Sequence, residues 1–181
     1  MEVVQTALPG VLILIPRLLA DDRGYFFETF NAKKFCELVA PVVFCQDNES
    51  LSQKNVIRGL HYQIGESAQS KLVSVVRGAI WDVAVDLRSS SPTFKQSFGI
   101  ELTSACRKQL FIPKGFAHGF LSLEDDTIVQ YKVDGYYSAQ DERGIAFDDG
   151  VLDIKWPMSG APKLSPKDQN HPKFTNADVF A

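Results

Sequence analysis

The sequence contains few of the residues that build metal sites and disulfide frameworks: three histidines and three cysteines among 181 residues. Cys36, Cys45 and Cys106 are odd in number and form no CxxC pair, which argues against a disulfide framework or a zinc site and favours a reducing compartment. The longest apolar run near the N-terminus, Val11 to Ile15, is too short to span a membrane and is closed by Pro16.

The chain also has no excess of basic residues, since it contains 19 Lys and Arg and 22 Asp and Glu. A nucleic acid polymer is therefore disfavoured as the main partner. The N-terminus has neither a basic region nor a cleavage-like segment, so we expect a soluble, cytoplasmic protein without membrane contact. Its length and its 45% content of hydrophobic residues predict one globular domain, residues 1–181.

Helical periodicity is sparse, and most of the chain alternates between apolar and polar residues with the period of a β-strand. We expect a hairpin over residues 71–87 with a tight turn at Arg77-Gly78. Residues 127–133 place Tyr131 on an apolar strand face. Many short strands separated by turn signals predict an all-β sandwich or small barrel.

Two short helices are expected. The first lies in "NAKKFCELVA", with Asn31 as its N-cap and Phe35, Leu38 and Val39 on its apolar face. The second begins at "SPKD", where a serine caps the helix, a proline suits the first turn and Asp168 occupies the capping-box position. Helix capping alone would be a sufficient role for Asp168.

The stretch "NVIRGLHYQ" looks like a strand that turns at Gly59 and then carries His61. His61 could be a metal ligand, a hydrogen-bonded core histidine or a general base. A metal needs three or four converging donors, and the spacing of the other histidines, His118 and His171, does not support such a set. The choice between core histidine and base stays open on pattern alone.

Other polar groups share this ambiguity. Lys71 and Tyr131 lie on strand faces with β-branched neighbours, His118 lies in "PKGFAHGF", and Arg23 and Glu28 bracket an aromatic cluster. An inward lysine is costly unless it meets an anion. Singly, each residue has an ordinary structural explanation, but together they favour a pocket for an anionic ligand with acid and base groups.

Longer segments carry a resemblance to a known family. "DDRGYFFETFN", "CQDNES", "NVIRGLHYQ", "QSKLVSVVRGAIWDVAVDLRSSSPTF", "FIPKGFAHGFLSL", "YKVDGYYSAQDERGIAFDD" and "LSPKD" occur in this order. They resemble the dTDP-4-dehydrorhamnose 3,5-epimerase family over roughly Leu8 to Asp168. The resemblance implies a cupin-like β jelly roll that acts as a homodimer, without metal or other cofactor, on a dTDP-4-keto-6-deoxyhexose.

The family's reaction assigns roles to the ambiguous residues. The substrate's C3 and C5 hydrogens lie beside the C4 carbonyl, so inversion needs a base, an acid on the opposite face and a positive group at the oxyanion. By match to the family's motifs, His61 would be the base, oriented by Asp168. Tyr131 would be the acid, and Lys71 would stabilise the oxyanion and contact the substrate.

The resemblance also implies binding positions. Arg58 would hold the diphosphate, His118 would line the sugar pocket and Tyr137 would line the cleft. The remaining matches to nucleotide-binding or peripheral positions are Arg23, Glu28, Gln46, Asn48, Glu142 and Lys167. Some of these would reach across the dimer interface.

The sequence departs from the family's usual pattern at Tyr25, at Ala146-Phe147 and in the tail that contains His171. These departures leave room for an epimerase of C3 or C5 alone. Two further alternatives are a non-catalytic cupin that binds sugar nucleotides and a metal-dependent cupin isomerase or oxygenase. The order of segments favours the 3,5-epimerase.

Overall fold

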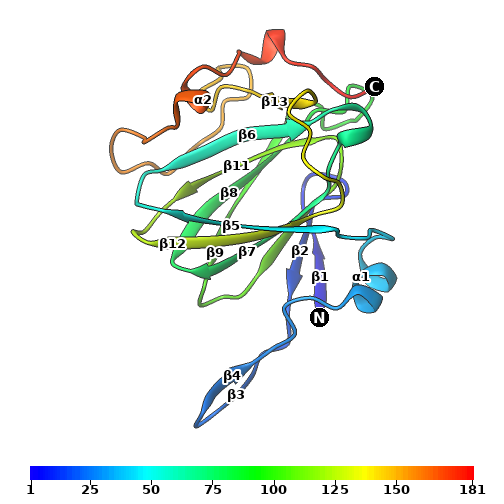
Figure 1. The fold of residues 1–181 in the computed structure, drawn as a ribbon, viewed down its shortest axis with the longest axis vertical. Coiled ribbons are helices and arrows are strands. Elements are labelled where there is room, and N and C mark those ends of the chain that lie inside the picture. Colours follow the sequence, from blue (N-terminus) through cyan, green and yellow to red (C-terminus); the bar gives the residue numbers. More distant parts are fainter.

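A computed structural model describes residues 1–181 and consists mainly of two antiparallel sheets that face each other (Figure 1). The first contains β1 (Glu2–Gln5), β2 (Leu12–Ile15), β5 (Gln46–Ser52), β7 (Lys71–Arg77), β10 (Gln109–Ile112) and β12 (Thr127–Val133), in the order β1-β2-β10-β7-β12-β5. The second contains β6 (Ile57–Gln63), β8 (Ala79–Asp86), β9 (Ser97–Thr103), β11 (Phe116–Ser122) and β13 (Glu142–Gly144), in the order β13-β6-β11-β8-β9. This is a cupin-like jelly roll, which confirms the predicted fold class.

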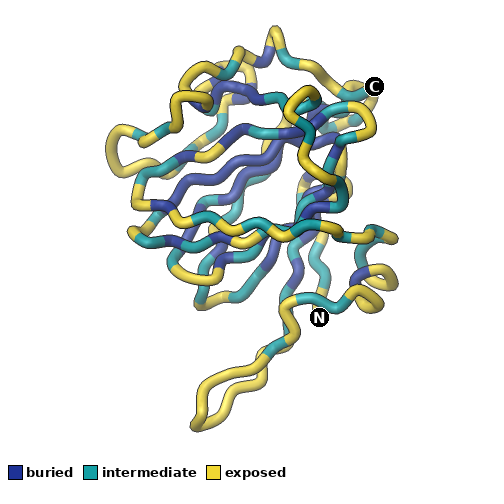
Figure 2. Tube along the Cα trace, in the orientation of Figure 1, coloured by how far each residue is buried: buried dark blue, intermediate teal, exposed yellow.

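The remaining elements lie outside the sheets. They are the hairpin of β3 (Leu19–Asp21) and β4 (Gly24–Phe26), the helices α1 (Ala32–Leu38) and α2 (Pro166–Gln169), and the 3-10 turns Gly65–Ser67 and Phe174–Asn176. The hairpin projects from the body of the molecule and is exposed along its length (Figures 1 and 2). None of the helices is long and apolar enough to cross a membrane.

The main core fills the space between the two sheets. Val73, Val75 and Val129 from the first sheet pack with Ile80 and Phe120 from the second. On the strand β8 both faces are buried, because the C-terminal part of the chain covers the outer side of the second sheet. Ala84 packs into the core between the sheets, whereas Val83 and Val85 pack on the outer side, so the face that carries Asp82 and Asp86 points into the interior.

The expected hairpin over residues 71–87 is wrong. Lys71–Arg77 and Ala79–Asp86 are both strands, but they belong to different sheets and do not pair with each other. Gly78, with φ of +79°, carries the chain from one sheet to the other, and a Cβ at this position would collide with Thr127. The glycine correctly indicated a change of chain direction at this position, but it could not specify which strands pair.

Gly59 is not a turn either, contrary to expectation. It lies inside β6 with φ of +124°, and a Cβ there would lie 2.6 Å from the Cα of Gly119 on β11. The register between these strands shifts between His118 and Phe120. The glycine thus permits close backbone approach at an irregularity that sets the course of the strand that carries His61.

Both predicted helices are present. Asn31 caps α1 by accepting a hydrogen bond from the backbone N–H of Lys34 at 3.1 Å. Phe35 is buried against Phe111, as expected, whereas Leu38 is 53% exposed, so its predicted place on the packed face is wrong. The helix has only seven residues and buries only Phe35.

Candidate active site

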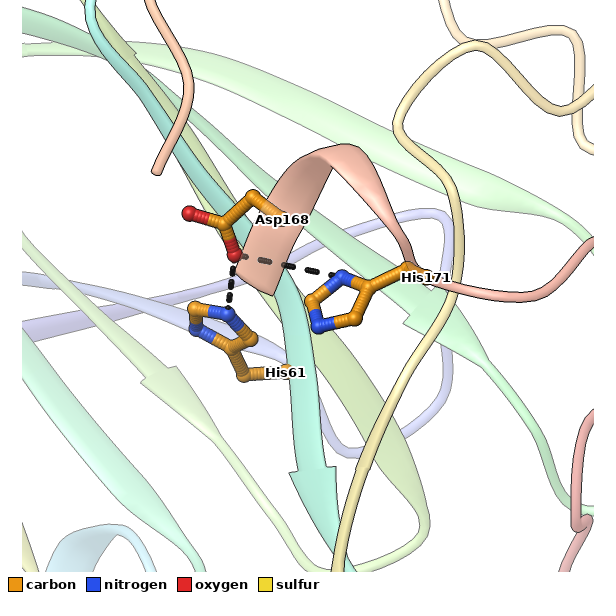
Figure 3. A group of neighbouring side chains, drawn as sticks. All are labelled: His61, Asp168 and His171. Carbon is orange, nitrogen blue, oxygen red and sulfur yellow. Dashed lines mark hydrogen bonds and ion pairs between the residues drawn. The ribbon is translucent and has the colours of Figure 1, made fainter. Parts of the chain in front are cut away.

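His61, on the second strand from one edge of the second sheet, forms a hydrogen-bonded pair with Asp168 (Figure 3). His61 projects from β6, and its Nε2 lies 2.6 Å from Oδ1 of Asp168 on α2. The other carboxylate oxygen accepts a hydrogen bond from the hydroxyl of Ser165 at 2.8 Å, and that hydroxyl also accepts one from the backbone N–H of Asp168. The cap of a one-turn helix therefore fixes the carboxylate that orients the imidazole.

The environment keeps Asp168 ionised. Burial raises the pKa of its carboxyl group, but the hydrogen bonds from His61 and Ser165 outweigh burial and hold that pKa below its ordinary value. An ionised carboxylate accepts only, so Nε2 of His61 carries the proton in the neutral imidazole. The lone pair is then on Nδ1, at the other side of the ring from Asp168 (Figure 3). This is the tautomer that a general base requires.

Tyr131 lies across a cavity from His61. The cavity has a volume of about 180 Å³, and its walls come from both sheets because His61 is on β6 and Tyr131 is on β12. The lining residues are Gln46, Asn48, His61, Tyr62, Gln63, Gln69, Lys71, Tyr131, Tyr137 and Glu142. Burial raises the pKa of the Tyr131 phenol, although the nearby charge of Arg58 opposes the shift. The phenol thus stays protonated and able to donate at neutral pH.

Lys71 supplies a positive charge to the same cavity. It begins β7 and faces the interior, and its Nζ lies 3.4 Å from the backbone oxygen of His61. Burial lowers the pKa of Lys71 to about 8, although the charges of Asp82 and Glu142 oppose the shift. The ammonium is therefore charged at neutral pH and close to titrating.

The pKa of Lys71 predicts an alkaline loss of activity. Because the ammonium loses its proton as the pH rises through about 8, kcat/KM should fall above that pH. Replacing Lys71 with methionine should lower kcat/KM by about 10²–10³-fold and flatten this alkaline limb. A pH profile from neutral to alkaline checks both effects.

The matched control is Lys33→Met, at an exposed position of α1, which should retain the fall in kcat/KM at alkaline pH. An unaltered alkaline limb in Lys71→Met would assign that titration to another group.

His118 forms a second histidine–carboxylate pair. It is the cross-strand neighbour of His61, and its Nε2 lies 2.6 Å from Oδ1 of the fully buried Asp82. Burial lowers the pKa of His118 although Asp82 opposes the shift, so the imidazole is neutral. The sequence had indicated His118 but no role for Asp82. The available signal was an acid alternating with Ala84 on an otherwise apolar strand.

Five of the predicted binding residues gather around the cavity. Nε2 of Gln46 donates to Oδ1 of Asn48 at 2.8 Å, and the hydroxyl of Tyr137 donates to Glu142 at 2.7 Å. Glu142 also forms an ion pair with Lys167. Four of these residues line the cavity, and Lys167 adjoins it through its ion pair with Glu142.

Three predicted binding residues lie elsewhere on this chain. Arg23 is in the projecting hairpin and pairs with Asp21, and Glu28 pairs with Lys34 of α1. Arg58 is exposed, and its guanidinium donates to the hydroxyl of Ser52 and the backbone oxygen of Leu51. Arg23 and Glu28 therefore lie away from the cavity on this chain, whereas Arg58 does not line the cavity but is near enough to Tyr131 for its charge to oppose the rise in the phenol's pKa.

Comparison with known proteins places the chain in a family. The sequence profile of dTDP-4-dehydrorhamnose 3,5-epimerase matches residues 5–176. A Shigella flexneri protein of that name is 49% identical over an alignment of 181 positions, which covers 99% of each chain. A dTDP-6-deoxy-D-glucose-3,5-epimerase from Legionella pneumophila, solved in complex with dTDP-4-keto-L-rhamnose, is 43% identical with a TM-score of 0.94, covering 98% of this chain and 94% of that one.

A more distant relative from Streptomyces niveus is named dTDP-4-dehydrorhamnose 3-epimerase. It is 37% identical over 164 residues, covering 90% of this chain and 79% of that protein. The profile match and the higher identities agree with the jelly roll. The chain belongs to the dTDP-4-dehydrorhamnose 3,5-epimerase family and is an isomerase.

Proposed function

We propose that the protein epimerises C3 and C5 of dTDP-4-dehydro-6-deoxy-D-glucose, which gives dTDP-4-dehydro-L-rhamnose for dTDP-L-rhamnose synthesis. The observation that supports the proposal is that His61, paired with Asp168, and Tyr131 line one cavity from strands of the two different sheets. Inversion of a carbon acid requires removal of a proton from one face and delivery to the other, and a base and an acid on facing walls meet this requirement.

The steps follow from the positions of these groups. Nδ1 of His61 takes the proton from a carbon next to the C4 carbonyl, and the electron pair of the C–H bond moves onto the carbonyl oxygen. The ammonium of Lys71 stabilises the resulting enolate oxygen. The enolate then takes a proton from the hydroxyl of Tyr131 on the opposite face. His61 has gained a proton and Tyr131 has lost one, and exchange with solvent restores both groups.

Incubation with dTDP-4-keto-6-deoxyglucose in deuterium oxide tests this function. We expect deuterium and inversion at both C3 and C5, read by NMR and product mass. Label and inversion at one carbon would instead support the single-centre alternative, for which the Streptomyces niveus 3-epimerase is a precedent in name. No exchange at either carbon by folded protein would refute the proposed substrate.

We propose that the substrate's sugar occupies the cavity and that its nucleotide lies outside. The volume of about 180 Å³ is smaller than the roughly 300–1,000 Å³ of most ligand pockets. The hexose fits this space, whereas the diphosphate and thymidine need a surface beyond it. The contacts on this chain would come from Gln46, Asn48, Tyr137 and Glu142, which line the cavity, and from Lys167, which pairs with Glu142. His118 is not among the lining residues and would act from behind the cavity wall.

We propose that a second copy of the chain completes the nucleotide site, with Arg23 and Glu28 supplied from the partner and Arg58 holding the diphosphate. The hairpin that carries Arg23 projects from the body and exposes 67% of Phe26 and 51% of Leu19 (Figure 2). Exposed apolar side chains on a projecting arm favour burial against a partner. The outer face of the first sheet has a hollow of about 480 Å³ that could receive it.

The dimer predicts a specific effect of charge in the arm. Phe26→Asp should shift the mass in solution from two chains towards one, because a carboxylate would have to be buried at the interface. Multi-angle light scattering measures this shift. Val151→Asp introduces the same charge at an exposed apolar position of the C-terminal region and should leave the mass unchanged. Equal behaviour of the two variants would rule out the arm as the dimer contact.

We also propose a cytoplasmic location. The three cysteines are exposed and free, which suits a reducing compartment.

A further inference from the structure

His171 is a buried imidazole without a hydrogen-bond partner. It follows α2, its side chain is 7% exposed, and neither Nδ1 nor Nε2 forms a hydrogen bond. The ring packs against the bare backbone of Gly144 on β13, where a Cβ would collide with it. Buried polar groups without partners are uncommon in proteins, so this ring is a candidate for binding something that the protein alone does not supply.

The unpartnered ring faces the catalytic pair (Figure 3). Its Nδ1 lies 3.8 Å from Oδ1 of Asp168, the same oxygen that lies 2.6 Å from Nε2 of His61. The three donor atoms all lie within 4.8 Å of one another. The two imidazole rings are nearly perpendicular, with centroids 5.2 Å apart. Two ring nitrogens and one carboxylate oxygen therefore converge on one point at the edge of the cavity.

We propose that His61, Asp168 and His171 form an inhibitory site for Zn²⁺. Zinc bonds to imidazole nitrogen and carboxylate oxygen are about 2.0–2.2 Å long, so tetrahedral ligands stand about 3.4 Å apart. The separation of 3.8 Å between His171 and Asp168 is close to this value. The hydrogen bond of 2.6 Å between His61 and Asp168 has to open by less than about 1 Å.

The donor set selects the kind of ion. Two imidazoles and one carboxylate suit zinc and its transition-metal neighbours, whereas Mg²⁺ and Ca²⁺ prefer oxygen ligands. Asp168 contributes one negative charge, and the adjacent Glu142 and Lys167 form an ion pair whose charges offset each other. His61, whose side chain is 32% exposed, leaves the fourth position open to water from the cavity.

Zinc at this site would remove the base. In the free pair the imidazole proton of His61 is on Nε2 and the lone pair is on Nδ1. Coordination uses the lone pair of Nε2, so the proton moves to Nδ1 and the ring stays neutral. Nδ1 then cannot accept a proton from the substrate. This consequence rests on the proposed function, whereas metal binding itself does not.

Cobalt provides a direct test, because Co²⁺ in a tetrahedral site absorbs strongly in the visible range. The test uses full-length protein without a polyhistidine tag, with Cys36, Cys45 and Cys106 changed to serine, since exposed thiols bind these ions. We expect one equivalent of Co²⁺ to give the tetrahedral spectrum and Zn²⁺ to displace it. Absence of that spectrum, or binding without displacement, would overturn the proposal.

Variants locate the site. His171→Asn should weaken Co²⁺ and Zn²⁺ binding at least about tenfold, since even loss of an outer partner of a metal ligand costs that much. His118→Asn makes the same change at the cross-strand neighbour of His61, whose ring pairs with Asp82, and should retain binding. Circular dichroism checks folding, and His171→Gln replaces His171→Asn if that variant is unfolded. Equal binding by the His171 variants and the parent would overturn the proposal.

A second readout measures epimerisation in chelator-buffered Zn²⁺. The parent should lose activity as Zn²⁺ saturates the cobalt-detected site and regain it with excess chelator. The His171 variant should require at least about tenfold more Zn²⁺ for half inhibition. If the parent has no epimerase activity, the proposed function fails while the cobalt titration still decides the metal site. Inhibition at equal Zn²⁺ in both proteins would contradict an inhibitory role.

Discussion

His61→Asn should reduce deuterium incorporation at both C3 and C5 by about 10³-fold or more, because the residue is the only proposed proton acceptor on its wall. Asparagine keeps a polar side chain of similar size but has no basic nitrogen. The loss should affect C3 and C5 together if one base serves both centres. NMR of the substrate in deuterium oxide measures each carbon separately.

The His61 prediction needs evidence that the site is still formed. The variant should bind dTDP with a thermal shift close to that of the parent, because His61 faces the sugar. Asp168→Asn is a second variant of the same pair: it keeps the base His61 but removes the anion that orients the imidazole. The rate of deuterium incorporation should again fall. Proton exchange within about tenfold of the parent in His61→Asn would show that another group is the base.

Tyr131→Phe should separate proton exchange from inversion. Without the phenol the enolate loses its acid on the far wall, so formation of the epimer should fall by about 10²–10³-fold. His61 can still remove a proton and, after exchange with solvent, return deuterium to the same face. The expected result is labelled substrate without inversion, detected by comparing the mass shift of recovered substrate with the yield of epimer.

A parallel loss of exchange and inversion in Tyr131→Phe would indicate that Tyr131 positions the sugar instead of protonating it. Retention of inversion at the parent's rate would remove it from the mechanism. Tyr62, the neighbour of His61 on β6, offers a matched control because its hydroxyl donates to the backbone oxygen of Asp178. Tyr62→Phe should lower both readouts equally or not at all, because that hydroxyl has a structural partner.

Sequence patterns predicted local structure well where the signal was local. Asn31 and Ser165 cap their helices as expected, because a cap involves atoms only three residues apart. The alternation in residues 127–133 placed Val129, Tyr131 and Val133 on the inner face, because strand periodicity fixes sides regardless of partners. The roles of His61 and Asp168 came from the family resemblance, and the pairing of their side chains is now seen directly.

Predictions that depended on strand pairing failed. Gly78 carries the signal of a turn, yet the strands on either side join different sheets. Gly59 carries the same signal and lies within a strand against Gly119. A glycine indicates that its position needs an unusual backbone angle or has no room for a Cβ. It does not indicate which distant segment of the chain imposes that need.

Local sequence patterns were enough to predict the strand faces, the helix caps and the set of titratable residues that a family resemblance could interpret. Which of these residues meet depends on the packing of distant segments. Asp168 accepts a hydrogen bond from the capping Ser165 and is also the partner of a histidine 107 residues earlier. His171 lies near the same carboxylate because α2 packs against β6. Such contacts depend on how two sheets and a C-terminal segment pack together. A pattern that spans a few neighbouring residues contains no information about that packing.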